Sequence, residues 1–231
     1  MNYISMRLRI LIALGVVLTP LAIWRMFFSS NVPAPVLSPE EAAIRKDQAD
    51  GNVTGLVEKV KTYSPKYAEK AVEGLGGLGP EALPLLDKVF KEDKRPKIRE
   101  RVVGAMLKPI LKAVKKGKPI PPKMTETLVT ALANDESAAV RGGAAAALGR
   151  VYDYNSVPFL LESMDDPDAS VRRKAHHAVS RIMGRRYVFD PTGPPAVRRA
   201  TIKAIESDWG PMKNKVGDYH DSHRHPEKPA S

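Results

Sequence analysis

The chain has 231 residues, no cysteine and a formal net charge of +11 at pH 7. This length suits one domain with a sizeable core plus appendages, and the lack of cysteine excludes disulfides, thiolate metal ligands and thiol catalysis. Hydrophobic residues make up 43% of the chain and aromatic residues 6%, a balance typical of helices that pack through small and aliphatic side chains.

An apolar run occupies residues 10–28 and is interrupted only by Gly15, Thr19, Pro20 and Arg25. As a helix it would span about 28 Å, close to the thickness of a bilayer core. We therefore expect a transmembrane anchor over residues 10–28. The alternatives are a cleaved signal peptide, for which the small residues at 32–34 offer a poor cleavage site, and a buried core helix.

Arg7 and Arg9 precede the apolar run, which favours an N-terminus inside the cell for residues 1–9. The predicted location is therefore a single-pass membrane protein whose main domain is extracytoplasmic, in the periplasm. Residues 29–51 are predicted to be a proline-rich and acidic linker that acts as a semi-rigid spacer. Within it, Ser38 can cap a short helix.

A pattern in residues 135–149, Asp-x4-Val-Arg-x2-Ala-Ala-x-Ala-Leu-Gly, recurs along the chain. It fits again from Asp93 and from Asp166, and a degenerate copy starts at Thr62. The first apolar positions of the four copies are Tyr67, Ile98, Val140 and Val171, separated by 31, 42 and 31 residues. Self-similarity at such a period predicts a repeat array, with an insertion of 11 residues in the second unit.

Each unit is predicted to form two antiparallel helices. The apolar positions of the pattern fall on one helix face at three- and four-residue spacing, and a second apolar-periodic segment precedes each copy. The aspartate is expected to accept free N–H groups at the start of the following helix. One pair cannot bury its apolar face alone, so neighbouring pairs must stack.

This pattern resembles the short bacterial type of HEAT repeat, over about residues 54–209. The resemblance implies an α-solenoid that usually binds other macromolecules and seldom catalyses a reaction. We predict an all-α fold with about four HEAT-like pairs in residues 52–209. A last helix that ends near Trp209 caps the array, and residues 210–231 form a disordered tail.

In this family the second helix of each pair resembles a lining for the concave side, and the same frame positions recur in each copy. Their middle part is rich in glycine and alanine, which predicts a hollow binding groove that is basic at both ends. The candidate groove residues are Arg101, Lys108, Gly142, Gly143, Ala146, Arg150, Arg173, Lys174, His177 and Arg181, with Glu100 and Gly104 at the same frame positions.

The motif arginines Arg99, Arg141 and Arg172 have a different predicted role. Arginine suits planar, bidentate pairing with carboxylates. We expect these arginines to be structural and to bridge to turn aspartates of adjacent repeats, namely Asp93, Asp135 and Asp166.

A basic strip accounts for most of the net charge, because residues 80–123 hold thirteen Lys and Arg against five Asp and Glu. Its candidate members are Lys94, Arg95, Lys97, Lys112, Lys115, Lys116, Lys118 and Lys123. It is either a solvated helix face or a contact surface for anionic lipid, nucleic acid, a cell-wall polyanion or an acidic protein. No aromatic residues are interleaved among these lysines, which argues against binding of single-stranded nucleic acid by base stacking. Pro109 is expected to kink or end its helix near Lys108.

The histidines do not predict a metal centre. His176 and His177 point about 100° apart on a helix and cannot chelate together, and His176 is predicted to be a hydrogen-bonded core residue. In the tail, His220, His223 and His225 are a metal candidate whose flexible ligands would first have to be ordered. The glycines of residues 74–79 match a dinucleotide fingerprint but lack the strand that must precede it.

No motif of phosphate binding, nucleophilic catalysis or zinc-dependent hydrolysis is present, so we infer no enzyme, no catalytic residue, no cofactor and no small-molecule substrate. Some members of the wider repeat family resemble bilin lyases or alkylation-repair glycosylases, but no motif here supports either. The predicted function is a membrane-anchored scaffold that mediates protein–protein interaction or complex assembly. The alternative is a binder of anionic polymers or anionic membrane surfaces through the basic strip.

Overall fold

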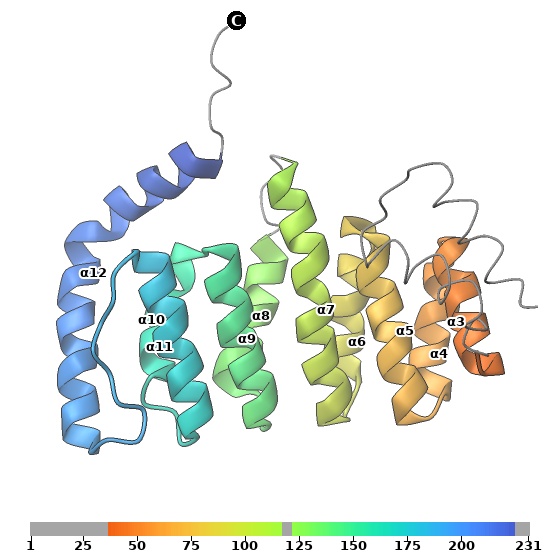
Figure 1. The fold of residues 1–231 in the computed structure, drawn as a ribbon, viewed down its shortest axis with the longest axis horizontal. Helices are drawn as coiled ribbons and strands as arrows, with labels where there is room; N and C mark the ends of the chain where they lie inside the picture. Colours follow the sequence, from red (N-terminus) through yellow and green to blue (C-terminus); the bar gives the residue numbers. More distant parts are fainter. Residues whose placement is uncertain (1–36, 117–121, 225–231) are drawn as a thin grey trace, which may run out of the picture. The chain divides into compact units, whose positions relative to one another are not determined.

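The computed structural model describes residues 37–116 and 122–224, with side chains for 37–116 and 124–211. Within these ranges the chain forms ten α-helices and two short 3-10 helices, and no strand. The all-α class predicted from the periodicity is confirmed. The helices follow one another in a regular array, as Figure 1 shows.

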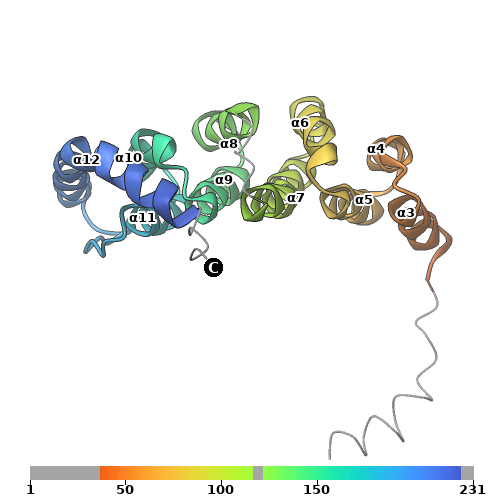
Figure 2. The same ribbon diagram turned by 90° about the horizontal axis from the view of Figure 1, so that it is seen from above.

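The array contains four antiparallel helical pairs, as predicted. Figure 2 shows the first helices of the pairs in one layer and the second helices in the other. The pairs are α4 (Val53–Thr62) with α5 (Pro65–Leu78), α6 (Leu83–Glu92) with α7 (Pro96–Lys115), α8 (Pro122–Asn134) with α9 (Ala138–Val151), and α10 (Val157–Ser163) with α11 (Ala169–Met183). The 3-10 helices η1 (Pro80–Ala82) and η2 (Tyr154–Ser156) lead into α6 and α10. A single core of buried aliphatic side chains runs between the layers.

Two further helices stand at the ends of the array. α3 (Pro39–Ala49) falls in the segment predicted as a linker, but its Ile44 is buried in the core beside the first pair. α12 (Pro195–Arg224) buries Ile205 and Trp209 in the core, which confirms the predicted capping helix. Its backbone continues as helix through residues 210–224, where the sequence predicts disorder. Both ends of the array are therefore longer than the repeat pattern alone indicates.

No helix within residues 37–116 and 122–224 is long and apolar enough to cross a membrane. The predicted anchor, residues 10–28, lies outside the described residues, as do residues 1–9. The predicted location, a single-pass membrane protein with an extracytoplasmic repeat domain, is corrected on this finding and withdrawn.

Proline 109 does not end its helix. α7 continues past Pro109 to Lys115, with Pro109 and the neighbouring Ile110 both buried. Of the two predicted effects of this proline, an end of the helix is therefore wrong, and a kink stays a prediction.

Two glycines bring second helices into backbone contact. A Cβ added to Gly149 of α9 would lie 2.7 Å from both Cα and Cβ of Ala178 on α11, and one added to Gly76 of α5 would lie 2.7 Å from the carbonyl oxygen of Ala105 on α7. Gly76 and Gly149 occupy the same frame position, and α7 has Leu107 there. Glycine at this frame position therefore allows the backbones to approach closely at the α5–α7 and α9–α11 junctions.

The motif arginines form an arginine–aspartate ladder along the turns, as predicted for two of the three. Arg99 donates from Nε and Nη2 to Asp135 at 2.7 and 3.0 Å, and Arg141 donates in the same way to Asp166 at 2.8 and 2.9 Å. Nη1 of each donates to carbonyl oxygens of its own turn, at 2.8 Å to Lys94 and 2.9 Å to Asp135. Each arginine thus joins two consecutive turns.

The turn after α11 also holds an aspartate, Asp190, which accepts the Thr192 N–H at 2.8 Å, but Arg172 departs from this pattern. Its Nε donates instead to the carbonyl oxygen of Pro191 at 2.6 Å, in the segment that leads to α12. The turn aspartates also act differently from the prediction. Asp135 accepts the N–H of Ser137 at 2.9 Å, before the helix begins, so it orders the turn; the true cap of α11 is Asp168, which accepts N–H groups of Ser170 and Val171.

The glycine contact predicts opposite effects at two helical positions. Gly149→Ala should lower the free energy of unfolding by about 1–3 kcal/mol, because the new methyl group overlaps the α11 backbone. Gly104→Ala is the matched control: nothing lies within 4 Å of its added Cβ, so it should be stabilising by up to about 1 kcal/mol. Urea denaturation measures both. Equal effects would show that α9 and α11 are not in close contact.

The ladder predicts acid sensitivity. Burial alone would raise the pKa of Asp135, but hydrogen bonds from Arg99 and the Ser137 N–H outweigh it and hold the pKa below the ordinary 3.8. A lowered carboxyl pKa stabilises the fold fully above that ordinary value, and this contribution is lost as pH falls through the lower folded value. Arg99→Met should therefore cost about 2 kcal/mol or more at pH 7 and progressively less below about pH 4.

Lys97→Met is the control for this experiment, because the exposed Lys97–Glu100 pair on the same helix should contribute less than about 1 kcal/mol. Denaturant titrations at several pH values measure the difference between each variant and the wild type. A cost of Arg99→Met that is the same at pH 3 and pH 7 would contradict the ionic role of the pair.

Candidate functional site

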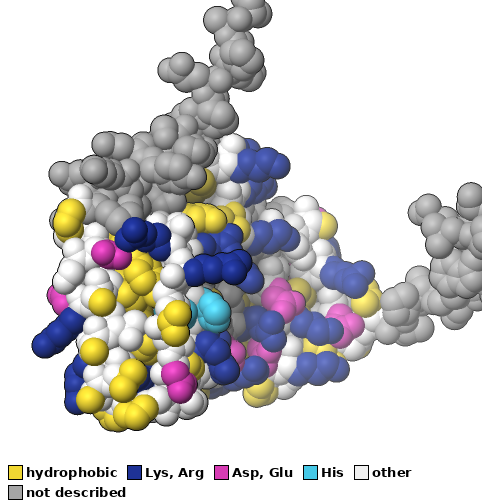
Figure 3. All heavy atoms as spheres, turned by 60° about the vertical axis from the view of Figure 1, so that its left-hand side comes forward, with side chains coloured by type: hydrophobic (Ala, Val, Ile, Leu, Met, Phe, Trp, Pro, Cys, Tyr) yellow, Lys and Arg dark blue, Asp and Glu magenta, His cyan; other side chains and the backbone are white. Residues whose placement is uncertain are grey.

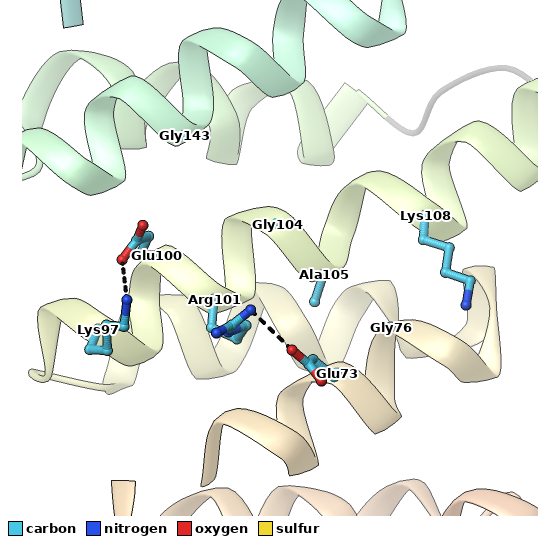
Figure 4. Close-up of a pocket in the computed structure, with 9 residues that line it drawn as sticks. All are labelled: Glu73, Gly76, Lys97, Glu100, Arg101, Gly104, Ala105, Lys108 and Gly143. Carbon is cyan, nitrogen blue, oxygen red and sulfur yellow. Dashed lines mark hydrogen bonds and ion pairs between the residues drawn. The ribbon is translucent and has the colours of Figure 1, made fainter. Parts of the chain in front are cut away.

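A cleft of about 590 Å³ opens on the layer of second helices. Figure 4 shows that it runs along one side of α7, with α5 and α9 on either side. α7 contributes most of the lining, and α5 and α9 contribute the rest. The lining residues are Lys97, Glu100, Arg101, Gly104, Ala105 and Lys108 of α7, Glu73 and Gly76 of α5, and Gly143 of α9.

Small residues form the floor of the cleft. Nothing lies within 4 Å of a Cβ added to Gly104, and a Cβ added to Gly143 would touch only Val103, at 3.6 Å. The backbone of both helices is therefore accessible from this side, and a bound chain can approach it without displacing a side chain.

Charged residues of both signs surround this floor. Arg101 lies between two carboxylates of α5: Nη2 is 2.7 Å from Glu69 Oε2, and Nη1 is 3.0 Å from Glu73 Oε1. Lys97 pairs with Glu100 at 3.1 Å. The Glu69 hydrogen bond raises the pKa of Arg101, which keeps the guanidinium charged. Lys108 is exposed and has no ion-pair partner among the described side chains.

The structure gathers only part of the predicted groove into this cleft. Arg101, Lys108 and Gly143 line it, together with Gly104 and Glu100 of the same frame. The predicted hollow at Gly142 is filled: an added Cβ would lie 2.9 Å from Cδ and 3.1 Å from Nζ of Lys174, whose side chain reaches across from α11. The open space therefore lies one helix earlier than the sequence predicts.

Glu69 and Glu73 are the charged residues that the sequence analysis missed. They occupy the same frame positions on α5 as Glu100 and Gly104 on α7, counted from Tyr67. The sequence signal for them is the degenerate first copy, in which these frame positions hold carboxylates.

The remaining predicted residues continue along the layer as a basic face. It consists of the exposed side chains Arg150, Arg173, Lys174, His177 and Arg181. The guanidinium of Arg181 lies over the ring of Tyr152, 5.0 Å from its centre. In Figure 3, Lys and Arg side chains gather around a histidine on this side. Ala146, which is half-buried on α9, lies in the same frame between the cleft and this face.

His176 serves the fold, as predicted. Its Nε2 lies 2.8 Å from the carbonyl oxygen of Tyr187, and its ring stacks on Phe189 with centroids 5.2 Å apart. Burial lowers its pKa, the more so because His177 is adjacent, although the Tyr187 hydrogen bond acts in the opposite direction. His176 therefore fixes the loop after α11 against the array.

The metal candidate of the sequence lies beyond what the structure describes. His225 lies outside the described residues, and the side chains of His220 and His223 are not described. Within the described part of the chain, no group of three or more His, Asp or Glu is placed to hold a metal ion.

The basic strip does not form one uniform row of free cations. Arg95 pairs with Asp93 at 2.6 Å and donates to the Val60 carbonyl oxygen at 2.8 Å, and Lys97 pairs with Glu100. Lys118 lies outside the described residues, and the side chain of Lys123 is not described. The described members that are exposed and make no ion pair with a described side chain are Lys94, Lys112, Lys115 and Lys116.

The family model described as HEAT repeats matches residues 125–201, from α8 into α12. The complex of CpcE and CpcF of phycocyanin lyase from Nostoc sp. PCC7120 is 19% identical, covering 68% of this chain and 99% of that chain with a TM-score of 0.47. A designed armadillo repeat protein in complex with the peptide (KR)4 is 17% identical, covering 71% and 74%, with a TM-score of 0.41. No curated protein matches. The described chain is a helical solenoid of four stacked pairs, and residues 125–201 of it match HEAT repeats.

Proposed function

We propose that this protein is an interaction scaffold whose layer of second helices binds an extended segment of a partner protein. The observation that carries the proposal is the cleft at Gly104 and Gly143, where two neighbouring helices leave their backbones accessible. Stacked helical repeats create extended binding surfaces of this kind.

The chemistry of the cleft suits a polypeptide. A floor without side chains admits the main chain of a ligand, and the rim offers carboxylates on α5 and ammonium groups on α7. Arg101 is already held by Glu69 and Glu73, so little freedom of this side chain remains to be lost on binding. A preorganised rim of this kind favours recognition over a weak general attraction.

The acidic side chains of the cleft favour binding over catalysis. Glu73 and Glu100 each form an ion pair with a cation, Arg101 and Lys97 respectively. A proton acceptor must be free to meet its substrate. Paired carboxylates instead keep the shape and charge of the surface constant.

The basic strip supports a second candidate function, the binding of an anionic polymer. Lys112, Lys115 and Lys116 are exposed at the end of α7 and make no ion pair with any described side chain. Binding through them should weaken steeply as salt rises, in proportion to the charges neutralised. Binding in the Gly104 cleft should depend less on salt, because its charges are largely paired.

The test is affinity capture with the full chain followed by quantitative mass spectrometry, with Gly104→Trp as the blocking variant. Nothing lies within 4 Å of a Cβ added at this position, so a tryptophan side chain there would extend into the cleft. We expect the recovery of specific partners to fall by about tenfold or more, as for the loss of a binding hot spot.

Lys88→Trp is the matched control, because it places the same bulk on α6, in the other layer of the same pair. It should leave recovery unchanged, and thermal unfolding of both variants should remain close to the wild type. Equal recovery by wild type and Gly104→Trp, or equal loss in both variants, would refute the proposed function.

A further inference from the structure

Arg101 and Lys174 stand at the same frame position, one on α7 and one on α11. Each side chain reaches back across the preceding second helix. Arg101 meets the carboxylate of Glu69 there, at 2.7 Å. Lys174 meets Gly142, which occupies the frame position of Glu69, and its Nζ lies 3.1 Å from an added Cβ. The two cations are therefore placed alike, but only one has a carboxylate to bind.

No acidic residue is available on the helices around Lys174. The sequences of α9 and α11 contain neither Asp nor Glu. Lys174 makes no ion pair with any described side chain. The ion pair that the second unit completes within the chain is thus left open in the fourth unit.

The surroundings of Lys174 add positive charge. Arg150 is exposed at the end of α9, and Arg181 is held over the Tyr152 ring on the same side as the exposed His177. Like charges close together raise the local potential and favour an incoming anion. Figure 3 shows this concentration of Lys and Arg side chains.

We propose that the basic face binds an acidic segment of the partner protein, with one carboxylate beside Lys174 in the place that Glu69 takes beside Arg101. This inference rests on the proposed function and adds the chemistry of the partner. Further carboxylates of the segment meet Arg150 and Arg181.

A short acidic segment fits this layer better than a nucleic acid. A phosphate backbone running along the layer from α11 would reach the cleft, where Glu73 and Glu100 are partly exposed. Like charges placed opposite each other weaken binding. A peptide needs to carry its negative charge only over α9 and α11.

The experiment measures binding of a fluorescent peptide of alternating glutamate and serine to the full chain by anisotropy. Lys174→Glu should weaken binding by about tenfold or more, because it sets like charges against each other. Gly142→Glu should do the same by supplying an internal carboxylate to Lys174. Gly142→Gln fills the same space without the charge, so it should weaken binding less than Gly142→Glu does.

Lys112→Glu is the charge-matched control on the basic strip, and it should change affinity by less than about threefold. Melting temperatures of all variants exclude misfolding. The inference is overturned if the wild type does not bind the peptide, or if Lys112→Glu weakens binding as much as Lys174→Glu. It is also overturned if Gly142→Gln weakens binding as much as Gly142→Glu, or if an oligonucleotide of equal charge binds more tightly than the peptide.

The two proposals fail separately. Loss of partner recovery with Gly104→Trp, together with no peptide binding, would leave the scaffold function standing and remove only the acidic partner. Peptide binding without any cleft-dependent partner would remove the scaffold function.

Discussion

The bidentate contact between a motif arginine and the aspartate of the next turn couples one helical pair to the next. Arg99 and Arg141 each satisfy two carbonyl oxygens of their own turn and two carboxylate oxygens of the following turn. Because these side chains are largely buried, an arginine or aspartate left without its partner would destabilise the fold. The requirement to keep both partners in contact fixes the spacing of the turns. The helices that follow these turns have the same spacing. The exposed frame positions of the second helices therefore lie at regular intervals along the layer.

A regular scaffold leaves the exposed frame positions free to vary in charge. They are acidic on α5, mixed on α7, small on α9 and basic on α11, with Glu69, Arg101, Gly142 and Lys174 as the clearest members. One set of residues therefore determines the repeated geometry of the array, and a different set determines the charge of its surface. A ligand that spans several helices would contact acidic residues at one end and basic residues at the other. The surface would therefore favour one orientation of the ligand.

Much of the fold could be read from the sequence because repeats depend on local patterns. The four pairs, the capping role of Trp209 and the ladder from Arg99 and Arg141 all follow from residue spacing. The position of the cleft does not, because it depends on how far side chains reach between helices: Lys174 covers Gly142, whereas Arg101 turns toward α5 and leaves Gly104 open. α3 was missed as part of the core because Ile44 alone carries its buried apolar contact.

Leu107 of α7 stands at the frame position that holds glycine in α5 and α9. The contacts between second helices are therefore not the same along the array. The backbones of α5 and α7, and of α9 and α11, approach closely at Gly76 and Gly149, whereas α7 and α9 meet through side chains such as Val103 against Gly143. Side-chain contacts can repack by changing rotamers, but close backbone contacts cannot. We therefore expect bending of the solenoid to concentrate between α7 and α9. Gly104 and Gly143 line the cleft there, so a bound segment that contacts both helices would restrict this bending.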